Sequence, residues 1–342
     1  MTLAILNEKI AETSWGLYSF AQYLLIYYLH FITHWNNNVN YKRLETFVWV
    51  ASLGNFRKAA ERLHTTQPAI SARIAGLEQE LGVKLFEREG GSSPIILTPK
   101  GKELLPYAEK ILYQSEQLRK QADVSSTYSG VLRLGVSETI VNTWLPDFLA
   151  QLHQDMPKLN VELTVDNTSS LAEGIKDRTL DLAFLMGPIS EPYIVNRALC
   201  TFSLSWVASP SLELPNRLLY LEELAPWPIV TYARSTKPYI EIAQKFRELE
   251  GAPVNFFAST SLAACLSLAV NAVGISTMPN VMIEKELADG KLRKLRAVWT
   301  PSDLSFTASY SDTPYNPIAE IATSLAVTSA KKYEAEHLDK KN

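Results

Sequence analysis

Polar side chains suited to contacting DNA bases cluster near one segment of the chain. Gln67, Ser71 and Arg73 fall in the first turns of a stretch whose other residues are mostly apolar. Glutamine pairs with adenine, arginine pairs with guanine, and serine bonds to several groups on base edges. The same side chains would also suit an ordinary solvent-exposed face. Spacing alone leaves both interpretations open, so the elements that carry these residues must be considered next.

A short helix is expected on each side of a tight turn before and within this stretch. Asn55 is a good N-cap for a helix whose inner face includes Phe56 and Leu63. After the turn, Thr66 caps the next helix, and Pro68 lies in its first turn, where a missing N–H costs nothing. The apolar stripe of that helix is formed by Ile70, Ile74, Leu77 and Leu81.

An earlier helix, with apolar residues at helical spacing from Leu44 to Ala51, ends at Gly54, and Gly82 ends the third. Three such helices with a tight turn predict a helix-turn-helix, whose third helix lies in the major groove of DNA. Residues 42–120 carry 13 Lys and Arg against 9 Asp and Glu, a net charge of +4 on an otherwise acidic chain. A locally basic segment suits contact with phosphates, although it also suits a solvated surface.

A hairpin and a long helix are expected to follow. Residues 84–88 and 95–97 have the pattern of two strands around a Gly- and Ser-rich turn, which predicts a wing with Arg88 at the phosphate backbone or minor groove. Thr98 and Pro99 then begin a helix that runs to about Asp123. Its apolar side is too large for a small winged domain to cover, which favours a dimer partner over burial in one domain.

Residues 44–101 resemble the amino-terminal signature of LysR-type transcriptional regulators, above all in AAERLHTTQPAIS and LEQELGVKLFER. The resemblance implies that Gln67, Pro68 and Ser71 contact DNA and that Arg88 contacts its backbone. Ala72 departs from the long polar or basic residue that many members carry there, and the turn after Arg88 lacks a second arginine. It also implies paired linker helices, a homodimer or homotetramer, contact with RNA polymerase, and a cytoplasmic, nucleoid-associated protein.

Strands and helices alternate in the remainder, which predicts an α/β fold with a parallel sheet in each of two lobes. A small polar hinge (residues 124–130) precedes this part. The expected strands are residues 131–136, 161–165, 180–185, 228–232, 254–258 and 274–279. More loosely than the amino-terminal match, this pattern resembles the periplasmic-binding-protein-like sensor domain of the same family. That resemblance implies an effector between the lobes, with crossings near Thr201 and Ser302 and a return strand at residues 304–310.

Ser and Thr residues gather at strand-to-helix junctions of both lobes, where helix amino ends attract anions. Ordinary N-capping explains any one cluster, whereas several equivalent clusters favour a ligand site. Glu138 would repel an anion unless it points outward, and Arg234 and Lys237 are nearby positive charges. A small carboxylate would suit such donors, but Glu138 speaks against it, and the identity of the effector stays open. The expected contacts are Ser137, Thr139, Thr168, Thr231 and Thr260.

The domain boundaries follow from these elements. An extension (1–40) precedes the winged helix-turn-helix (41–98), the linker helix (99–129), the effector-binding domain (130–330) and a tail (331–342). Lobe I spans about 130–201 and 303–330, and lobe II spans about 202–302. The apolar stretch at residues 16–35 leaves three interpretations open: a start codon assigned too early, an added amphipathic helix, or the membrane anchor of a tethered regulator.

Composition excludes several other classes. With 46% hydrophobic and 20% charged residues the chain is globular and not disordered. Cys200 and Cys265 have no metal-ligand spacing, and the five histidines form no catalytic pattern. Because no Gly-rich phosphate loop or nucleophile elbow occurs, we expect no cofactor and no enzyme activity. A transport-type binding protein is disfavoured by the predicted DNA-binding segment.

Overall fold

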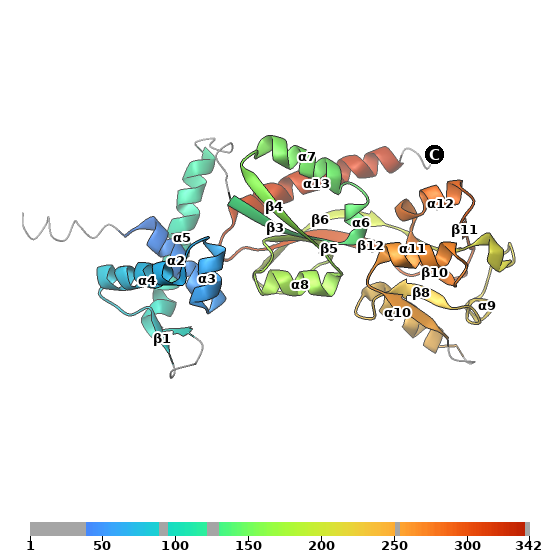
Figure 1. The fold of residues 1–342 in the computed structure, drawn as a ribbon, viewed down its shortest axis with the longest axis horizontal. Coiled ribbons are helices and arrows are strands. Elements are labelled where there is room, and N and C mark those ends of the chain that lie inside the picture. Colours follow the sequence, from blue (N-terminus) through green and yellow to red (C-terminus); the bar gives the residue numbers. More distant parts are fainter. Residues whose placement is uncertain (1–38, 89–94, 122–129, 250–253, 339–342) are drawn as a thin grey trace, which may run out of the picture. The chain divides into compact units, whose positions relative to one another are not determined.

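A computed structural model of the chain describes residues 39–88, 95–121, 130–249 and 254–338. They divide into two compact units, one up to Leu112 and one from Tyr113 onward, and each is described by itself (Figure 1). Among the described residues no helix is long and apolar enough to cross a bilayer. The stretch at residues 16–35 lies outside the described residues.

The first unit begins with the three expected helices, α2 (Tyr41–Leu53), α3 (Phe56–Arg62) and α4 (Gln67–Leu81). The side chain of Asn55 accepts hydrogen bonds from the backbone of Arg57 and Lys58, and that of Thr66 accepts one from Ala69, so both N-caps are confirmed. Gly54 and Gly82 end α2 and α4 in the left-handed conformation. The buried faces of these helices meet in one core that includes Phe47, Ile70 and Leu77.

The wing consists of two short antiparallel strands, β1 (Phe86–Arg88) and β2 (Ile95–Leu97), in which Arg88 pairs with Ile95. Residues 89–94, the expected turn, lie outside the described residues. Thr98 donates to the Lys84 carbonyl and accepts from Gly101 N, so one hydroxyl joins the wing to the first turn of α5 (Pro99–Gln121). That helix agrees closely with the predicted linker helix.

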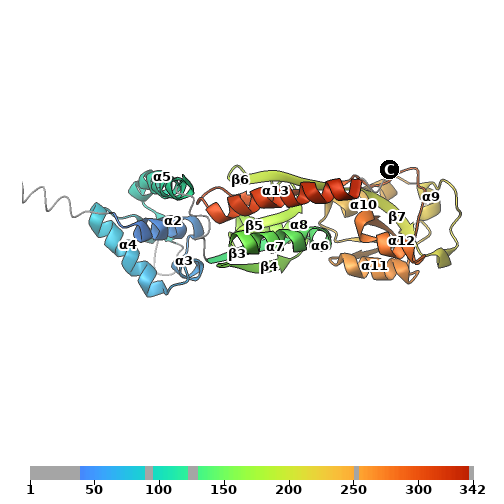
Figure 2. The same cartoon turned by 90° about the horizontal axis from the view of Figure 1, so that it is seen from above.

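The second unit has two α/β lobes. In lobe I, α7 (Leu145–Asp155) and α13 (Pro317–Leu338) pack on one face of a five-stranded sheet and α8 (Thr168–Lys176) on the other (Figures 1 and 2). The short helix α6 (Glu138–Val141) follows β3 directly. The sheet has the order β4 (Leu159–Val165), β3 (Gly130–Val136), β5 (Leu182–Met186), β12 (Leu304–Ser311) and β6 (Ile194–Phe202).

Lobe II repeats this arrangement. Its sheet separates two apolar clusters, one on the side of α10 (Lys237–Arg247) and one on the side of α11 (Leu262–Val270). The short helices α9 (Leu221–Leu224) and α12 (Glu284–Ala288) lie in its connections. The strand order is β11 (Arg293–Lys294), β7 (Leu204–Ala208), β10 (Ile275–Pro279), β8 (Ile229–Tyr232) and β9 (Phe256–Ser259).

The sheets differ from the prediction because they are mixed and not parallel throughout. In lobe I, β12 runs antiparallel to both β5 and β6, and in lobe II, β7 runs antiparallel to β10. These antiparallel strands flank the two points where the chain passes between the lobes. These strands are antiparallel because the chain enters or leaves a lobe through them, and no helix connects them to the neighbouring strand as in a βαβ unit. Local alternation of strands and helices therefore did not reveal their direction.

Two helical segments also differ from expectation. The single helix expected from Ile140 is broken into α6 and α7, with Pro146 in the first turn of α7. The predicted tail at residues 331–342 begins inside α13, which continues to Leu338. The inner face of α13 is formed by Ala319, Ala322, Ala326 and Ala330, all buried. Small alanines are a weak signal for a core-facing helix, so the sequence alone did not locate it.

Candidate nucleic-acid interface and interlobe cleft

The leading edge of α4 is exposed and polar. Gln67, Pro68 and Ser71 are all exposed, whereas Ile70 and Ile74 on the inner face are buried in the core of the unit. Thr66 accepts a hydrogen bond from Ala69 N and fixes where the helix begins. The structure therefore brings three of the predicted DNA contacts to one surface at the start of the helix, the position from which such helices reach base edges.

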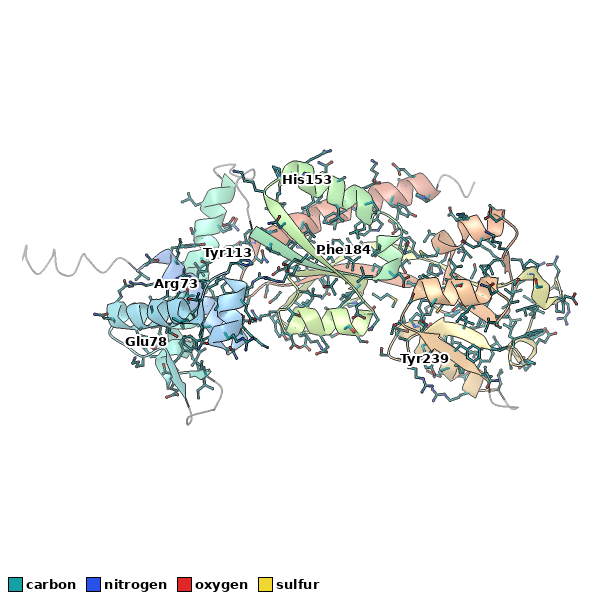
Figure 3. All side chains as sticks on the ribbon, viewed as in Figure 1. Arg73, Glu78, Tyr113, His153, Phe184 and Tyr239 are labelled. Atoms are coloured by element: carbon teal, nitrogen blue, oxygen red, sulfur yellow. The ribbon has the colours of Figure 1, made fainter. Side chains whose placement is uncertain are left out.

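Arg73 is not part of this edge. It is half-buried, and its Nη1 lies 3.5 Å from Thr46 Oγ1 on α2 (Figure 3). Successive helical residues turn by about 100°, so Arg73 lies on a face roughly opposite to that of Ser71. The sequence prediction grouped the two residues by proximity along the chain, and the helical period separates them.

Arg88 is placed through its backbone alone. It pairs with Ile95 at the end of β1, so its main chain lies in the wing as expected. Its side chain lies outside the described residues, and its contact with the DNA backbone stays a prediction.

Glu78 is a residue of this unit that sequence reasoning missed. Its carboxylate is buried and accepts hydrogen bonds from Leu85 N at 2.9 Å, Phe86 N at 3.4 Å and Lys84 Nζ at 2.6 Å (Figure 3). Burial by itself would raise the pKa of Glu78, but these hydrogen bonds outweigh it and hold the pKa below its ordinary value. The carboxylate thus joins the last turn of α4 to the first strand of the wing.

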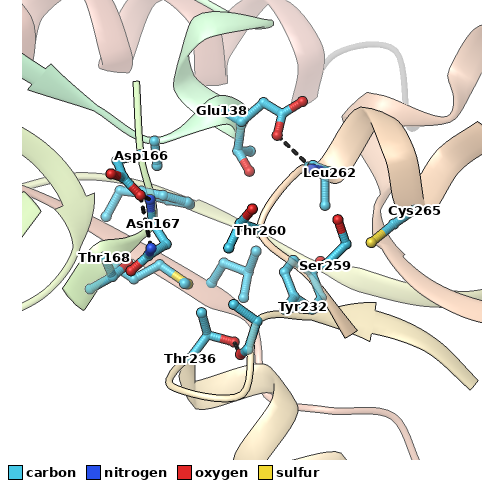
Figure 4. A pocket seen from close by; sticks show the side chains of 16 residues that line it. Glu138, Asp166, Asn167, Thr168, Tyr232, Thr236, Ser259, Thr260, Leu262 and Cys265 are labelled. Carbon is cyan, nitrogen blue, oxygen red and sulfur yellow. Dashed lines mark hydrogen bonds between the residues drawn. The ribbon is translucent and has the colours of Figure 1, made fainter. Parts of the chain in front are cut away.

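A cleft between the two lobes holds a cavity of about 60 Å³ (Figure 4). Both lobes supply its lining. From lobe I come Ser137, Glu138, Thr139, Asp166, Asn167, Thr168, Met186, Leu304 and Phe306, and from lobe II come Tyr232, Ala233, Thr236, Ser259, Thr260, Leu262 and Cys265.

Four of the five predicted effector contacts line this cleft: Ser137, Thr139, Thr168 and Thr260. Thr231 does not. It is fully buried within β8, where its carbonyl accepts a hydrogen bond from Cys265 Sγ at 3.3 Å. Successive side chains of a strand point to opposite faces of the sheet, so Thr231 points away from the face of its neighbour Tyr232, which does line the cleft.

The amino ends of the helices at the cleft are capped from within the chain. Asn167 Oδ1 accepts from Ser169 N and Ser170 N at the start of α8. At the start of α11, Glu138 of lobe I accepts from Leu262 N and Ala263 N of lobe II (Figure 4). The sequence predicted Glu138 at the crevice without a partner. In the structure its carboxylate reaches across the crevice and bonds to the backbone of the opposite lobe.

Three buried hydroxyl oxygens at the cleft have no hydrogen-bond partner among the described residues: Ser137 Oγ, Thr168 Oγ1 and Tyr232 OH. Buried polar atoms are normally paired, so an unpaired hydroxyl that also lines a cleft is free to bond to a ligand there. Burial also raises the pKa of Tyr232, which keeps its hydroxyl protonated and able to donate. Sequence reasoning missed Tyr232 because it lies within a strand and not in a hydroxyl cluster.

The positive charges predicted to favour an anion lie elsewhere. Arg234 is exposed and does not line the cleft, and Lys237 Nζ lies 3.6 Å from Glu241 Oε1 on its own helix. Lys237 lines an adjoining cavity together with Asp303. No group of three or more residues that could hold a metal ion occurs among the described residues.

A winged helix-turn-helix followed by two α/β lobes with a cleft between them defines a ligand-responsive DNA-binding regulator. Residues 41–102 match the model of the bacterial regulatory helix-turn-helix protein, lysR family, and residues 125–318 match the LysR substrate binding domain. The chain belongs to the LysR family of transcriptional regulators.

Individual relatives agree with this assignment. The chain is 28% identical over 255 residues to the HTH-type transcriptional regulator GltR of Bacillus subtilis, covering 75% of this chain and 84% of the relative. It is 35% identical over 154 residues to the "Probable hydrogen peroxide-inducible genes activator" of Streptomyces viridosporus, covering 45% of this chain and 49% of that protein.

Solved structures share the fold. Full-length OxyR from Pseudomonas aeruginosa superposes with a TM-score of 0.57 at 21% identity, covering 85% of this chain and 94% of that one. ArgP from Mycobacterium tuberculosis gives the same TM-score of 0.57 and the same identity of 21%, covering 84% and 96%. At this identity the likeness concerns the fold alone, so the individual contacts are argued from this chain.

Proposed function

We propose that the exposed edge of α4, formed by Gln67, Pro68 and Ser71, discriminates between promoter sequences, while Arg88 in the wing contacts the DNA backbone. The observation that carries this proposal is the contrast across α4, whose polar edge is exposed while Ile70 and Ile74 are buried. Glutamine and serine side chains at that position suit base edges in the major groove. Arg73, turned toward α2, contributes instead to the fold of the winged helix-turn-helix unit, hereafter the head.

We propose further that a small-molecule effector binds in the interlobe cleft and changes the packing of the two lobes. Because the site is made by both lobes, a ligand that contacts both has a different affinity for each lobe arrangement, and such a difference shifts the equilibrium between them. The unpartnered hydroxyls of Ser137, Thr168 and Tyr232 support this assignment.

The active form is proposed to be a homodimer or homotetramer joined through α5. Tyr107, Ile111 and Leu118 on this helix are exposed, with 50–72% of each side chain accessible. Apolar residues at helical spacing gain from burial against a second copy. As a promoter-bound protein it would act on the cytoplasmic nucleoid, contact RNA polymerase, and carry out no catalysis of its own.

The test compares DNA binding of Gln67→Ala, Arg88→Ala and Gln79→Ala in the full chain. Gln79 is exposed on the same helix but far from its leading edge, which makes it the matched control. Gln67→Ala should reduce the preference for a promoter over random DNA by about 10-fold or more, since a bidentate base contact provides about 1–3 kcal/mol of discrimination. Arg88→Ala should weaken binding to all sequences and lower its salt dependence.

The two variants must differ for the proposal to stand. Equal losses on promoter and random DNA for both would contradict the division between α4 and the wing. Protein that prefers no genomic promoter fragment over bulk competitor DNA would contradict the regulatory function itself.

A further inference from the structure

The amino end of α11 is already occupied by a carboxylate from the opposite lobe. Glu138 Oε2 accepts a hydrogen bond from Leu262 N at 2.5 Å, and Glu138 Oε1 accepts one from Ala263 N at 2.9 Å. The next amide, Ala264 N, bonds to Ser261 Oγ at 3.2 Å. The first three amides of the helix are therefore all bonded, and the favourable field at a helix amino end acts on a carboxylate that belongs to the chain.

The amino end of α8, on the other side of the cleft, is also satisfied internally. Asn167 Oδ1 accepts from Ser169 N at 2.9 Å and from Ser170 N at 3.1 Å. Thr168, the residue between the cap and these amides, is left with its hydroxyl oxygen buried and without a partner among the described residues. What α8 offers a ligand is thus a hydroxyl group and not a pair of free amides.

The charges at the cleft are unfavourable to an anion. Among the described residues that line it, Glu138 and Asp166 are acidic, and none is Lys, Arg or His. The adjoining cavity adds one basic and one acidic residue, Lys237 and Asp303, so it does not change the balance. Glu138 is half-buried, so its charge is only partly screened and repels a second negative charge placed beside it, whereas the exposed Asp166 adds less.

We propose that Glu138 is a built-in carboxylate ligand of this cleft, and that the effector is consequently a polar molecule without negative charge, either uncharged or cationic. It is bound by the hydroxyls of Ser137, Thr168 and Tyr232. This inference rests on the proposed function, since it assigns the chemistry of the effector site. An effector of this class takes the place of the carboxylate effector that the hydroxyl clusters suggested from the sequence.

The three hydroxyls fit this ligand class. Ser137 is only 8% exposed, and its Oγ has no partner among the described residues. A hydroxyl both donates and accepts, so three of them satisfy the amide, hydroxyl or amine groups of an uncharged or cationic ligand. They bring no positive charge to offset an added carboxylate. The site therefore separates ligands by charge as well as by shape.

The test uses acetate as a probe of the position that Glu138 fills. Glu138→Ala removes the carboxylate, and acetate has the size of the atoms removed. Thermal unfolding of the full chain is followed while sodium acetate replaces sodium chloride at constant ionic strength. We expect acetate to raise the midpoint of Glu138→Ala saturably, by about 3–5 °C at tenfold excess over its dissociation constant, and to leave the wild type unchanged.

Two further variants complete the design. Asp166→Asn removes a negative charge from the cleft but frees none of the α11 amides, so it should not respond to acetate. Glu138→Ser opens the same position and should respond like Glu138→Ala, which covers the case in which the alanine variant does not fold.

Each outcome decides the inference. Acetate stabilisation of the wild type would show that a carboxylate site remains open and would overturn it. Absence of any response in Glu138→Ala and Glu138→Ser would equally overturn it, because the α11 amino end would not be an anion position. Since no DNA is present in this assay, a failure here is distinct from a failure of promoter recognition.

Discussion

The exposed edge of α4 (Gln67, Pro68 and Ser71) and the interlobe cleft place their polar groups in opposite environments. At the edge, Gln67 and Ser71 lie on one helix within a few residues, and both are exposed. At the cleft, Ser137, Thr168 and Tyr232 come from three separate elements, and their hydroxyl oxygens are buried. The edge of α4 therefore needs only one correctly capped helix, whereas the cleft needs two lobes packed in one arrangement.

The difference has an energetic consequence. An exposed polar side chain remains hydrated, so its presence at the edge has little effect on folding. A buried hydroxyl without a partner destabilises the fold by roughly 1–3 kcal/mol, which a ligand recovers when it binds. A substitution that removes such a hydroxyl at the cleft should therefore raise stability and lower ligand affinity. In the head, the largest losses of stability should come from buried groups on the inner side of α4 and not from its exposed edge.

The largest effect is expected at Glu78, which lies behind the edge. Glu78→Ala should lower the free energy of unfolding of the head by about 2–4 kcal/mol, because it leaves the fully buried Leu85 N–H without its charged acceptor. Denaturant unfolding measures the loss, and amide hydrogen exchange at Leu85 and Phe86 localises it. Lys84→Ala is the control: the Lys84 side chain is 78% exposed, and an exposed ion pair contributes little.

The pH dependence of Glu78 sharpens this prediction. Its folded pKa is held below the ordinary value of 4.5, so its contribution to stability is complete at neutral pH and is lost as the pH falls below about 4.5. The stability difference between wild type and Glu78→Gln should accordingly shrink as the pH is lowered through that range. A difference that stays constant, or grows in acid, would contradict the role assigned to the carboxylate.

The head was largely predictable from its sequence, and the reason is local. Asn55, Thr66 and Gly82 act on residues at most four positions away, so their types alone predicted where α3 and α4 begin and end. Arg73 was misplaced even though the helical period in the same residues would have separated it from Ser71. The hydrogen bonds from Glu78 to the start of β1 were missed because they join two different elements, and such a contact produces no periodic pattern in the sequence.

The cleft was predictable only in part. Hydroxyls at strand ends pointed to Ser137, Thr139, Thr168 and Thr260, because the carboxyl ends of parallel strands meet at one edge of a sheet. The bond from Glu138 to α11 joins residues more than a hundred positions apart, and it depends on how the lobes face each other. No local pattern shows which of two neighbours, Thr231 or Tyr232, faces the cleft.

A smaller effect of opposite sign is expected at the cleft. Thr168→Val keeps the shape of the side chain and removes its buried, unpartnered hydroxyl, so the ligand-free protein should become more stable by about 0.5–1.5 kcal/mol. The same variant should lose about 10-fold in affinity for an effector once one is identified. Denaturant unfolding tests the first part now, and calorimetry tests the second.

Thr231→Val is the matched control for that substitution. Thr231 Oγ1 is also buried without a partner among the described residues, but the residue does not line the cleft. It should therefore gain similar stability and keep its effector affinity. If Thr168→Val is destabilising, its hydroxyl has a structural partner and is not reserved for a ligand.

The smallest effect is expected at the two thiols. Burial raises the pKa of Cys200 to about 12, and burial together with the nearby Glu138 charge raises that of Cys265 to about 11. Since the thiolate is the reactive form, on the order of one molecule in ten thousand or fewer carries it at neutral pH. We expect hydrogen peroxide to leave DNA binding unchanged within about twofold, although Cys265 lines the effector cleft.

Alkylation of the folded full chain by iodoacetamide provides the direct measurement. The labelling rate should be far slower than that of the unfolded chain at neutral pH, and it should rise about tenfold per pH unit toward pH 11. Cys200→Ser serves as the control that isolates Cys265. Rapid labelling of Cys265 at neutral pH in the Cys200→Ser variant would mean that the cleft opens to solvent far enough to ionise this thiol. The buried hydroxyls beside it would then be hydrated and not reserved for a ligand.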